Sequence, residues 1–237
     1  MRKITIFLAL VILAVSGCAS TKSGIFSEAP IALVSVAANY DINWKGEGTI
    51  SDSAISRMVR RTMGADEEWV IFTRADTIID EIEEMIRNTL ETSPLVSLAP
   101  RDDVLRSRAY NEARINLVQE REQMVKPTGY RLINYRDNNF FPALARETGI
   151  ERSLFITLDL TKEMHGGFGK NGNCRASVEM TVMLKDSRGK NLFNKTYHAF
   201  SRGTTKVTSG AYSQEELLDL LRSAISNACQ NFLDDLH

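Results

Sequence analysis

The residues of this chain that could do chemistry are a glycine-rich stretch, three histidines and three cysteines. The stretch from His165 to Gly172 includes Lys170, and such a composition is typical of loops that bind phosphate through backbone amides. A phosphate loop also needs Ser or Thr after the lysine and a helix after the loop. Here Asn171 follows Lys170 and the next residues alternate as a strand, so we expect a hairpin loop. Its Gly167 and Phe168 are candidate contacts for another protein.

Neither the histidines nor the serines form a catalytic pattern. The histidines have no spacing typical of zinc ligands, and no serine lies in a G-x-S-x-G turn. Adjacent acidic pairs lie on predicted helices, where we expect solvated surface groups: Glu83 with Glu84, Asp102 with Asp103 and Asp234 with Asp235. We therefore predict a non-catalytic protein with no cofactor and no metal.

The amino terminus has the three parts of an export signal. Basic Arg2 and Lys3 precede an apolar run over residues 4–15, and Ser16 and Gly17 follow it immediately before Cys18. The apolar run has 12 residues, whereas a helix needs about 20 to cross a membrane. We therefore expect residues 1–17 to be removed as a signal peptide.

Val15, Ser16, Gly17 and Cys18 resemble the lipobox of the bacterial lipoprotein family, which has an aliphatic residue, two small residues and a cysteine. The resemblance implies cleavage between Gly17 and Cys18 and acylation of the Cys18 thiol. Two or three acyl chains, at about 0.8 kcal/mol per buried methylene, would hold the chain permanently at a membrane. Ala19 stands where an Asp would resemble the inner-membrane retention signal, so the resemblance implies the outer membrane, on its periplasmic side.

The remaining composition is ordinary for a globular protein, with 43% hydrophobic and 25% charged residues. Without the two basic residues of the signal, 27 of the 29 basic residues remain against 30 acidic ones, a net charge of −3. Nothing in this balance indicates a nucleic-acid partner. Residues 18–30 are polar and aperiodic and predict a flexible, lipidated tether, and residues 31–237 are enough for one periplasmic α/β domain.

Two cysteines, Cys174 and Cys229, remain if Cys18 carries lipid. In an oxidising compartment they could form a disulfide bond between a strand and the last helix. Both lie on apolar faces of their predicted elements, so two buried free thiols are the alternative.

Periodicity in the first half predicts one buried strand and several helices. Ile31–Ala38, which reads IALVSVAA, predicts a strand buried on both faces and central in its sheet. Residues 76–92 predict a helix that begins with a capping box at Thr77 and Asp80. The sequence also predicts a basic amphipathic helix over 53–63, short strands over 69–72, 95–98 and 130–135, and a helix over 140–148 that Gly149 ends.

One further helix is predicted over residues 101–121. Its apolar stripe of small and aliphatic residues at intervals of four is narrow: Leu105, Ala109, Ala113 and Leu117. A narrow stripe means that the helix either covers a sheet edge or completes its burial against a partner. Arg106 and Arg114, on its polar side, are candidate partner contacts.

Strict alternation of apolar and polar residues then predicts three successive strands, over 154–161, 174–185 and 191–202. We expect an antiparallel meander with one wet face, followed by a long helix over 213–237 with a capping box at Ser213 and Glu216. The predicted fold class is therefore α/β (α+β): a mixed sheet that ends in a three-stranded antiparallel meander, with helices packed on it and a long C-terminal helix.

This order of elements resembles the periplasmic α/β domain shared by the curli secretion-channel lipoproteins, the LpoB activators of penicillin-binding proteins and the amino-terminal domains of TolB proteins. The resemblance rests on Ile31–Val36 as the opening strand, on residues 144–150 as the helix that enters the meander, and on residues 185–190 as a turn within it. Residues 39–74 depart from the direct strand-to-helix passage of these proteins.

The resemblance implies a lipid-anchored cell-envelope module that binds or assembles with another envelope protein or the cell-wall machinery, and it allows an oligomer. A subunit of an oligomeric outer-membrane secretion channel is the alternative. Residues 39–50 and 119–135 are too polar for the apolar membrane hairpins that such a channel needs. An envelope hydrolase is the third alternative.

Overall fold

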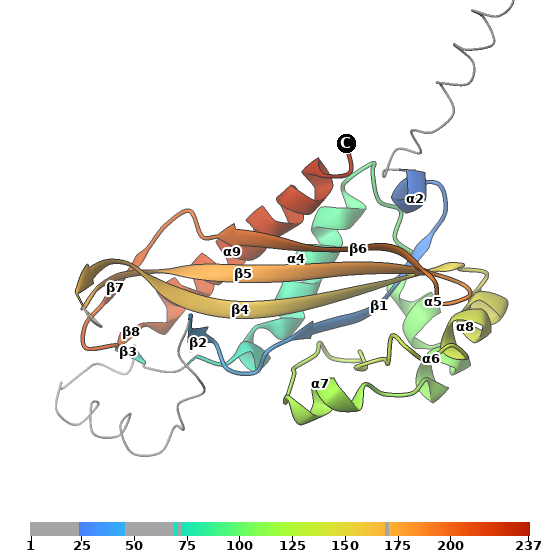
Figure 1. Cartoon of the computed structure of the whole chain (residues 1–237), viewed down its shortest axis with the longest axis horizontal. Helices are drawn as coiled ribbons and strands as arrows, with labels where there is room; N and C mark the ends of the chain where they lie inside the picture. The colour runs from blue at the N-terminus through green and yellow to red at the C-terminus, as the bar shows by residue number, and fades with distance from the viewer. Residues whose placement is uncertain (1–23, 46–68, 71–72, 169–170) are drawn as a thin grey trace, which may run out of the picture.

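The computed structural model describes residues 24–45, 69–70, 73–168 and 171–237 (Figure 1). Its main sheet is mixed, with the strand order β1-β4-β5-β6. β1 (Ile31–Ala38) pairs in parallel with β4 (Arg152–Phe168), whereas β4, β5 (Asn171–Asp186) and β6 (Asn191–Phe200) pair antiparallel in succession. Helix α9 (Gln214–Asp234) follows the meander. The predicted fold class and its three-stranded meander are thus confirmed.

The remaining elements are short. β2 (Asn43–Trp44) pairs with β4, β7 (Thr205–Val207) pairs with β5, and β3 (Trp69–Val70) pairs with β8 (Tyr212–Ser213) in a separate two-stranded sheet. Helix α2 (Gly24–Ser27) precedes β1. The connection from β3 to β4 contains η1 (Ala75–Thr77), α4 (Ile79–Glu91), α5 (Arg101–Leu105), α6 (Arg108–Glu112), α7 (Leu117–Arg121) and α8 (Phe140–Thr148).

Helices α4 and α9 lie side by side on one face of the sheet (Figure 1). The apolar side chains of the alternating strands point toward them and are fully buried, as Leu158, Val178 and Val182 illustrate. Helix α9 packs against them with a stripe at helical spacing that includes Leu217, Leu221 and Phe232. Each such side chain stabilises the fold by about 1.5–3 kcal/mol on burial, so this layer is the main core.

On the opposite face of the sheet, the residues that the structure describes cover β1 and the start of β4. Val34 of β1 and Phe155 of β4 pack there against a second core that includes Tyr110, Phe141 and Leu144 from α6 and α8. Because helices cover both of its faces, every residue of β1 is buried. The prediction that β1 is central in the sheet is wrong, since β1 ends the strand order and, among the described residues, its other side has only isolated bridges, to Leu98 and Val125.

The predicted single helix over residues 101–121 is wrong, because polar side chains divide it into α5, α6 and α7. The Ser107 hydroxyl accepts a hydrogen bond from the backbone N–H of Tyr110, and the Asn116 side chain accepts from Val118 and Gln119. Ser and Asn favour such caps over the interior of a helix. The stripe at intervals of four therefore does not form one face.

Other local predictions are also corrected. Residues 95–98 and 130–135 form isolated bridges and no strand. The capping box at Thr77 and Asp80 is absent, because the Thr77 hydroxyl donates to the Arg74 carbonyl and the Asp80 carboxylate accepts from Thr128. In contrast, α8 ends at Gly149 as predicted, with a left-handed φ of 74°. The predicted helix over 53–63 lies outside the described residues.

The glycine-rich stretch is strand over most of its described length. β4 and β5 continue to pair as far as Phe168 and Asn171, with Gly167 opposite Gly172. A Cβ on Gly167 would lie 2.1 Å from the Asn171 carbonyl oxygen, so the close approach of the two backbones requires glycine. The element that follows Asn171 is a strand, as the sequence predicted, and a helix N-terminus for phosphate is therefore missing from this stretch.

The capping prediction for the last helix is confirmed in part. The Ser213 hydroxyl accepts from the backbone N–H of Glu216, at 3.4 Å, but the Glu216 carboxylate accepts from the Thr205 hydroxyl instead of closing the capping box. None of the helices in the described part of the chain is long and apolar enough to cross a membrane.

Candidate functional site

An open groove of about 1240 Å³ lies between the sheet and the segment 113–136. Its floor is a face of β4 and β5 that none of the described helices covers, with Thr157 and Asp159 from β4 and Thr181 and Met183 from β5. Its wall is the segment itself, which carries α7. A concave site with a few polar groups is the usual form of a binding site.

The wall is held rigidly although it contains little regular structure. Val125 and Ala38 exchange two backbone hydrogen bonds, of 2.8 and 3.0 Å, which tie the wall to the end of β1. The Arg131 guanidinium donates to the carbonyl of Tyr110, and the Arg131 backbone N–H donates to the Tyr110 hydroxyl. The Asn134 N–H donates to the Arg114 carbonyl at 2.8 Å and closes the base of the segment.

This rigid wall exposes two adjacent apolar side chains. Leu117 and Val118, at the start of α7, are 58% and 61% exposed. Both line the groove, where Tyr135 and Met183 extend the apolar surface. Single exposed apolar residues are common in folded proteins, but several apolar side chains that line one concavity indicate a contact site.

Charged groups flank the apolar surface at both ends. Arg114 and Arg136 lie beside Tyr135, and the Arg136 guanidinium stacks over the Tyr135 ring at 5.6 Å. Asp159 is on the floor, and burial together with Glu179 opposite it on β5 raises its pKa above the usual range. Across the next pair of strands, Glu179 lies 3.3 Å from His198.

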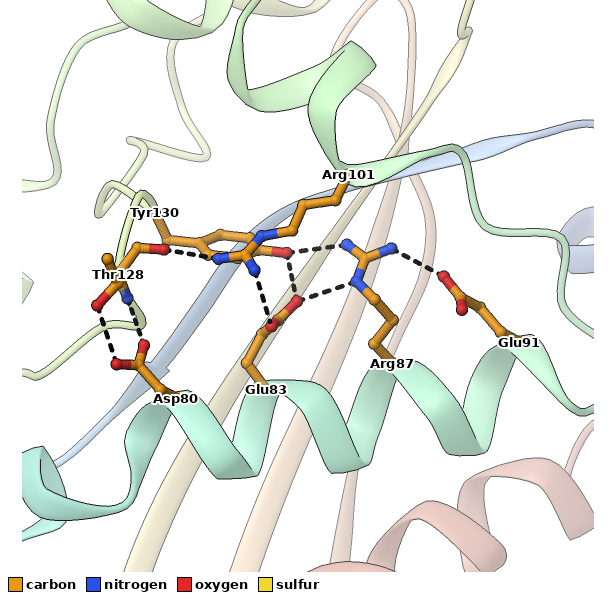
Figure 2. Close-up of polar contacts among 7 residues, drawn as sticks. All are labelled: Asp80, Glu83, Arg87, Glu91, Arg101, Thr128 and Tyr130. Carbon is orange, nitrogen blue, oxygen red and sulfur yellow. Dashed lines mark hydrogen bonds and ion pairs between the residues drawn. The ribbon is translucent and has the colours of Figure 1, made fainter.

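A second cluster of charged side chains, with Glu83 and Arg87 largely buried at its centre, lies between α4 and the loop 128–130 (Figure 2). Glu83 is 3% exposed, and its carboxylate accepts from Arg87 Nε at 3.0 Å and from the Tyr130 hydroxyl at 2.7 Å. Arg101 lies over the Tyr130 ring at 5.2 Å and 3.8 Å from Glu83. The prediction that Glu83 is a solvated surface group is wrong, because these partners satisfy its charge away from water.

The cluster holds residues 128–130, at the base of the groove wall, against α4, and is called the clamp below. Burial and the bond to Glu83 raise the pKa of Tyr130, so this phenol keeps its proton and donates it to the carboxylate. Burial opposes the charge of Arg87, but hydrogen bonds to Tyr130, Glu83 and Glu91 outweigh burial and raise the Arg87 pKa. Asp80, one turn earlier, accepts from the N–H and hydroxyl of Thr128 at 2.5 and 2.9 Å (Figure 2). All of these groups are engaged with one another, which favours a structural role.

The candidate residues from the sequence are scattered. Arg114 lies in the groove, whereas Arg106 is exposed on α5–α6 and pairs with Asp102 at 2.7 Å. Phe168, next to Gly167 at the far end of β4, is 91% exposed. The cleavage and lipidation residues Gly17 and Cys18 lie outside the described residues.

The structure distinguishes between a Cys174–Cys229 disulfide and two free thiols. Cys174 and Cys229 are both buried free thiols, so the bridge is not formed. The Cys229 sulfur lies 3.9 Å from the sulfur of Met180. Burial raises the pKa of Cys174 to about 11 and that of Cys229 to about 12, which keeps both thiols protonated. In the part of the chain that the structure covers, no three His, Cys, Asp or Glu residues are arranged to hold a metal ion.

No known protein family and no curated protein matches the chain in sequence. Solved structures overlap with it at low identity. The LpoB C-terminal domain from Salmonella enterica has 9% identity and a TM-score of 0.30, over 74% of this chain and 84% of that one. Lipoprotein GNA1162 from Neisseria meningitidis has 14% identity and a TM-score of 0.32, over 86% and 99% of the two chains. The hypothetical protein CT253 from Chlamydia trachomatis has 13% identity and a TM-score of 0.33, over 88% and 92%.

Sequence reasoning missed most of the groove. Val118, Tyr135 and Met183 fall in a predicted helix and two predicted strands with no common site, and Arg136 falls in no predicted element. The floor residue Met183 belongs to the predicted wet face of the meander, but its proximity to the wall depends on how a long connection folds back. One available signal was Asn116 directly before Leu117 and Val118, since a capping residue there ends the previous element and starts α7.

Proposed function

We propose that this chain is a lipid-anchored module of the bacterial cell envelope that binds another envelope protein through the groove and is not an enzyme. The observation that carries the proposal is the hydrogen-bonded wall that exposes Leu117 and Val118 beside a face of the sheet that no described helix covers. Apolar side chains with a preformed backbone make good contact residues, because little conformational entropy is lost on binding.

The proposed anchor would place the two ends of the domain at different distances from the membrane. Arg152, at the start of β4, donates to the Ile25 carbonyl of α2, close to the proposed tether. Phe168 lies at the other end of the same strand, 17 residues long, which at about 3.3 Å per residue is roughly 50 Å away. Figure 1 shows α2 and the tip of the β4–β5 hairpin at opposite ends of the molecule. A partner in the periplasm could therefore reach the groove and the tip together.

The binding proposal is tested with the full lipidated chain in detergent-extracted envelopes. Changing Leu117 and Val118 to Asp should abolish recovery of the partner, because two apolar contacts become charges. The matched control is Leu192→Asp on β6, which is 37% exposed and lies outside the groove. Equal recovery with all three chains would refute the groove as the binding site.

The anchor proposal has its own test. A Cys18→Ala chain has no thiol to acylate, so it should move from the membrane fraction to the soluble fraction while its unfolding midpoint is unchanged. Retention of the Cys18→Ala chain in the outer-membrane fraction would contradict the anchor.

A further inference from the structure

The groove is polarised along its length. The Asn134-to-Arg114 backbone bond brings Arg114 beside residues 134–136, and Tyr135 and Met183 both pack against the second core, where Met183 pairs with Phe155 across β5 and β4. At the other end, the Val125 pair with Ala38 places Glu122 and Met124 near the strand position of Asp159. Four residues of β4 separate Phe155 from Asp159, which is about 13 Å. One end is therefore basic, the other acidic, and the two ends are about 13 Å apart.

The two arginines at the basic end have no carboxylate partner among the described residues. Asp137 is the nearest acidic residue in sequence, but it is buried and its carboxylate accepts from the backbone N–H groups of Arg114 and Asn139. Some other exposed arginines are paired, as Arg108 is with Glu112 at 2.7 Å, whereas Arg121, Arg146 and Arg202 are exposed without a carboxylate partner among the described residues but lie outside the groove. The guanidinium groups of Arg114 and Arg136 thus remain available for a ligand.

The apolar surface of Leu117 and Val118 belongs to the same groove as this basic end. A membrane surface would meet a flat or convex basic patch, whereas here the arginines line a concavity that also contains the carboxylate of Asp159. A polypeptide segment fits better, because it can present apolar side chains and a carboxylate at fixed spacing. Arginine is suited to such a carboxylate because its planar group makes two parallel hydrogen bonds.

On the basis of the function proposed above, we propose that the groove takes an acidic amphipathic segment of the partner protein. The partner's apolar side chains lie on Leu117 and Val118, and a carboxylate of the same segment binds Arg114 and Arg136. The acidic end of the groove sets the direction, since it repels the partner's carboxylate.

The experiment places a photoreactive amino acid at Val118 of the full lipidated chain and irradiates intact envelopes. Arg114 and Arg136 are then changed together to Glu. The matched control changes Arg146 and Arg202, two exposed arginines outside the groove, to Glu and so alters the net charge equally. We expect the adduct to fall about tenfold or more in the groove variant, because like charges then face each other, and to persist in the control.

Mass spectrometry of the adduct then identifies the partner's peptide. We expect this peptide to contain Asp or Glu within a few residues of the side chain that is crosslinked to position 118. A change of that acidic residue of the partner to Lys should restore the adduct with the chain in which Arg114 and Arg136 are Glu. An adduct that survives charge reversal, or a peptide without carboxylates, overturns this inference and leaves the binding function standing. A lipid adduct overturns it in favour of a membrane contact. If no adduct forms from Val118 in the unchanged chain, the proposed function itself fails.

Discussion

Removal of one hydroxyl group tests whether the buried charge cluster clamps the groove wall. In a Tyr130→Phe chain the aromatic ring keeps its place under Arg101, but two hydrogen bonds are lost: the donation to Glu83 at 2.7 Å and the acceptance from Arg87 at 2.9 Å. A hydrogen bond to a charged group contributes about 1.5–3 kcal/mol. Glu83 and Arg87 remain bonded to each other, so the two losses do not add fully. We expect the free energy of unfolding to fall by about 2–3 kcal/mol.

The assay is urea unfolding followed by tryptophan fluorescence and circular dichroism. Tyr135→Phe is the matched control, since the Tyr135 hydroxyl has no hydrogen bond with the residues that the structure describes, and its change should stay within about 0.5 kcal/mol. Glu83→Gln should cost more, about 3–5 kcal/mol, because it leaves Arg87, whose side chain is only 12% exposed, with the exposed Glu91 as its one charged partner among the described residues. Equal stability of the Tyr130→Phe and Tyr135→Phe chains would refute the clamp.

Three further predictions follow from single residues. Thr128 holds the pKa of Asp80 low, so the stability that Asp80 contributes is present above about pH 4 and is lost as the pH falls through its lower folded-state pKa. An Asp80→Asn chain should therefore be less stable than the unchanged chain near neutral pH. The difference between their unfolding midpoints should disappear as the pH is lowered. Gly149→Ala should lower the free energy of unfolding by about 1 kcal/mol in the same assay, because φ is 74° and the surrounding structure places no atom within 4 Å of the added Cβ. A decrease several times larger would mean that the added Cβ also clashes with its surroundings. In a Cys18→Ser chain, Cys174 and Cys229 should resist Ellman's reagent at mildly alkaline pH until the protein unfolds, since both thiols are buried with raised pKa values; fast reaction of the folded chain would contradict their burial.

The strands and the long helix could be predicted because their burial is periodic. β5 alternates so strictly that the apolar residues at every second position, from Cys174 to Leu184, are all buried on the face that α9 covers. The helix α8 could be predicted as well, since Gly149 ends it in the left-handed backbone region, which glycine adopts far more readily than other residues. These signals are local, so the sequence carries them without knowledge of the tertiary structure.

The groove and the clamp could not be predicted, because each depends on distant contacts. Glu83 and Glu84 are neighbours in one helix, yet Glu83 is buried because Tyr130, 47 residues later, donates to it. Similarly, β1 has the apolar composition of a central strand because helices on both faces of the sheet bury it. In the strand order, however, it lies at the end. Periodicity reports that a face is buried, and it does not report what covers that face.

Oxidation of methionines in intact envelopes tests the central claim that the groove is occupied by a partner. Met183 and Met124 line the groove, and Met164 lies outside it with similar partial burial. We predict that hydroxyl radicals oxidise Met183 and Met124 several-fold more slowly in intact envelopes than in the purified lipidated chain, while Met164 reacts at the same relative rate in both. The protection should vanish when Leu117 and Val118 are changed to Asp. Equal oxidation of the groove methionines in envelopes and in the purified chain would contradict the account.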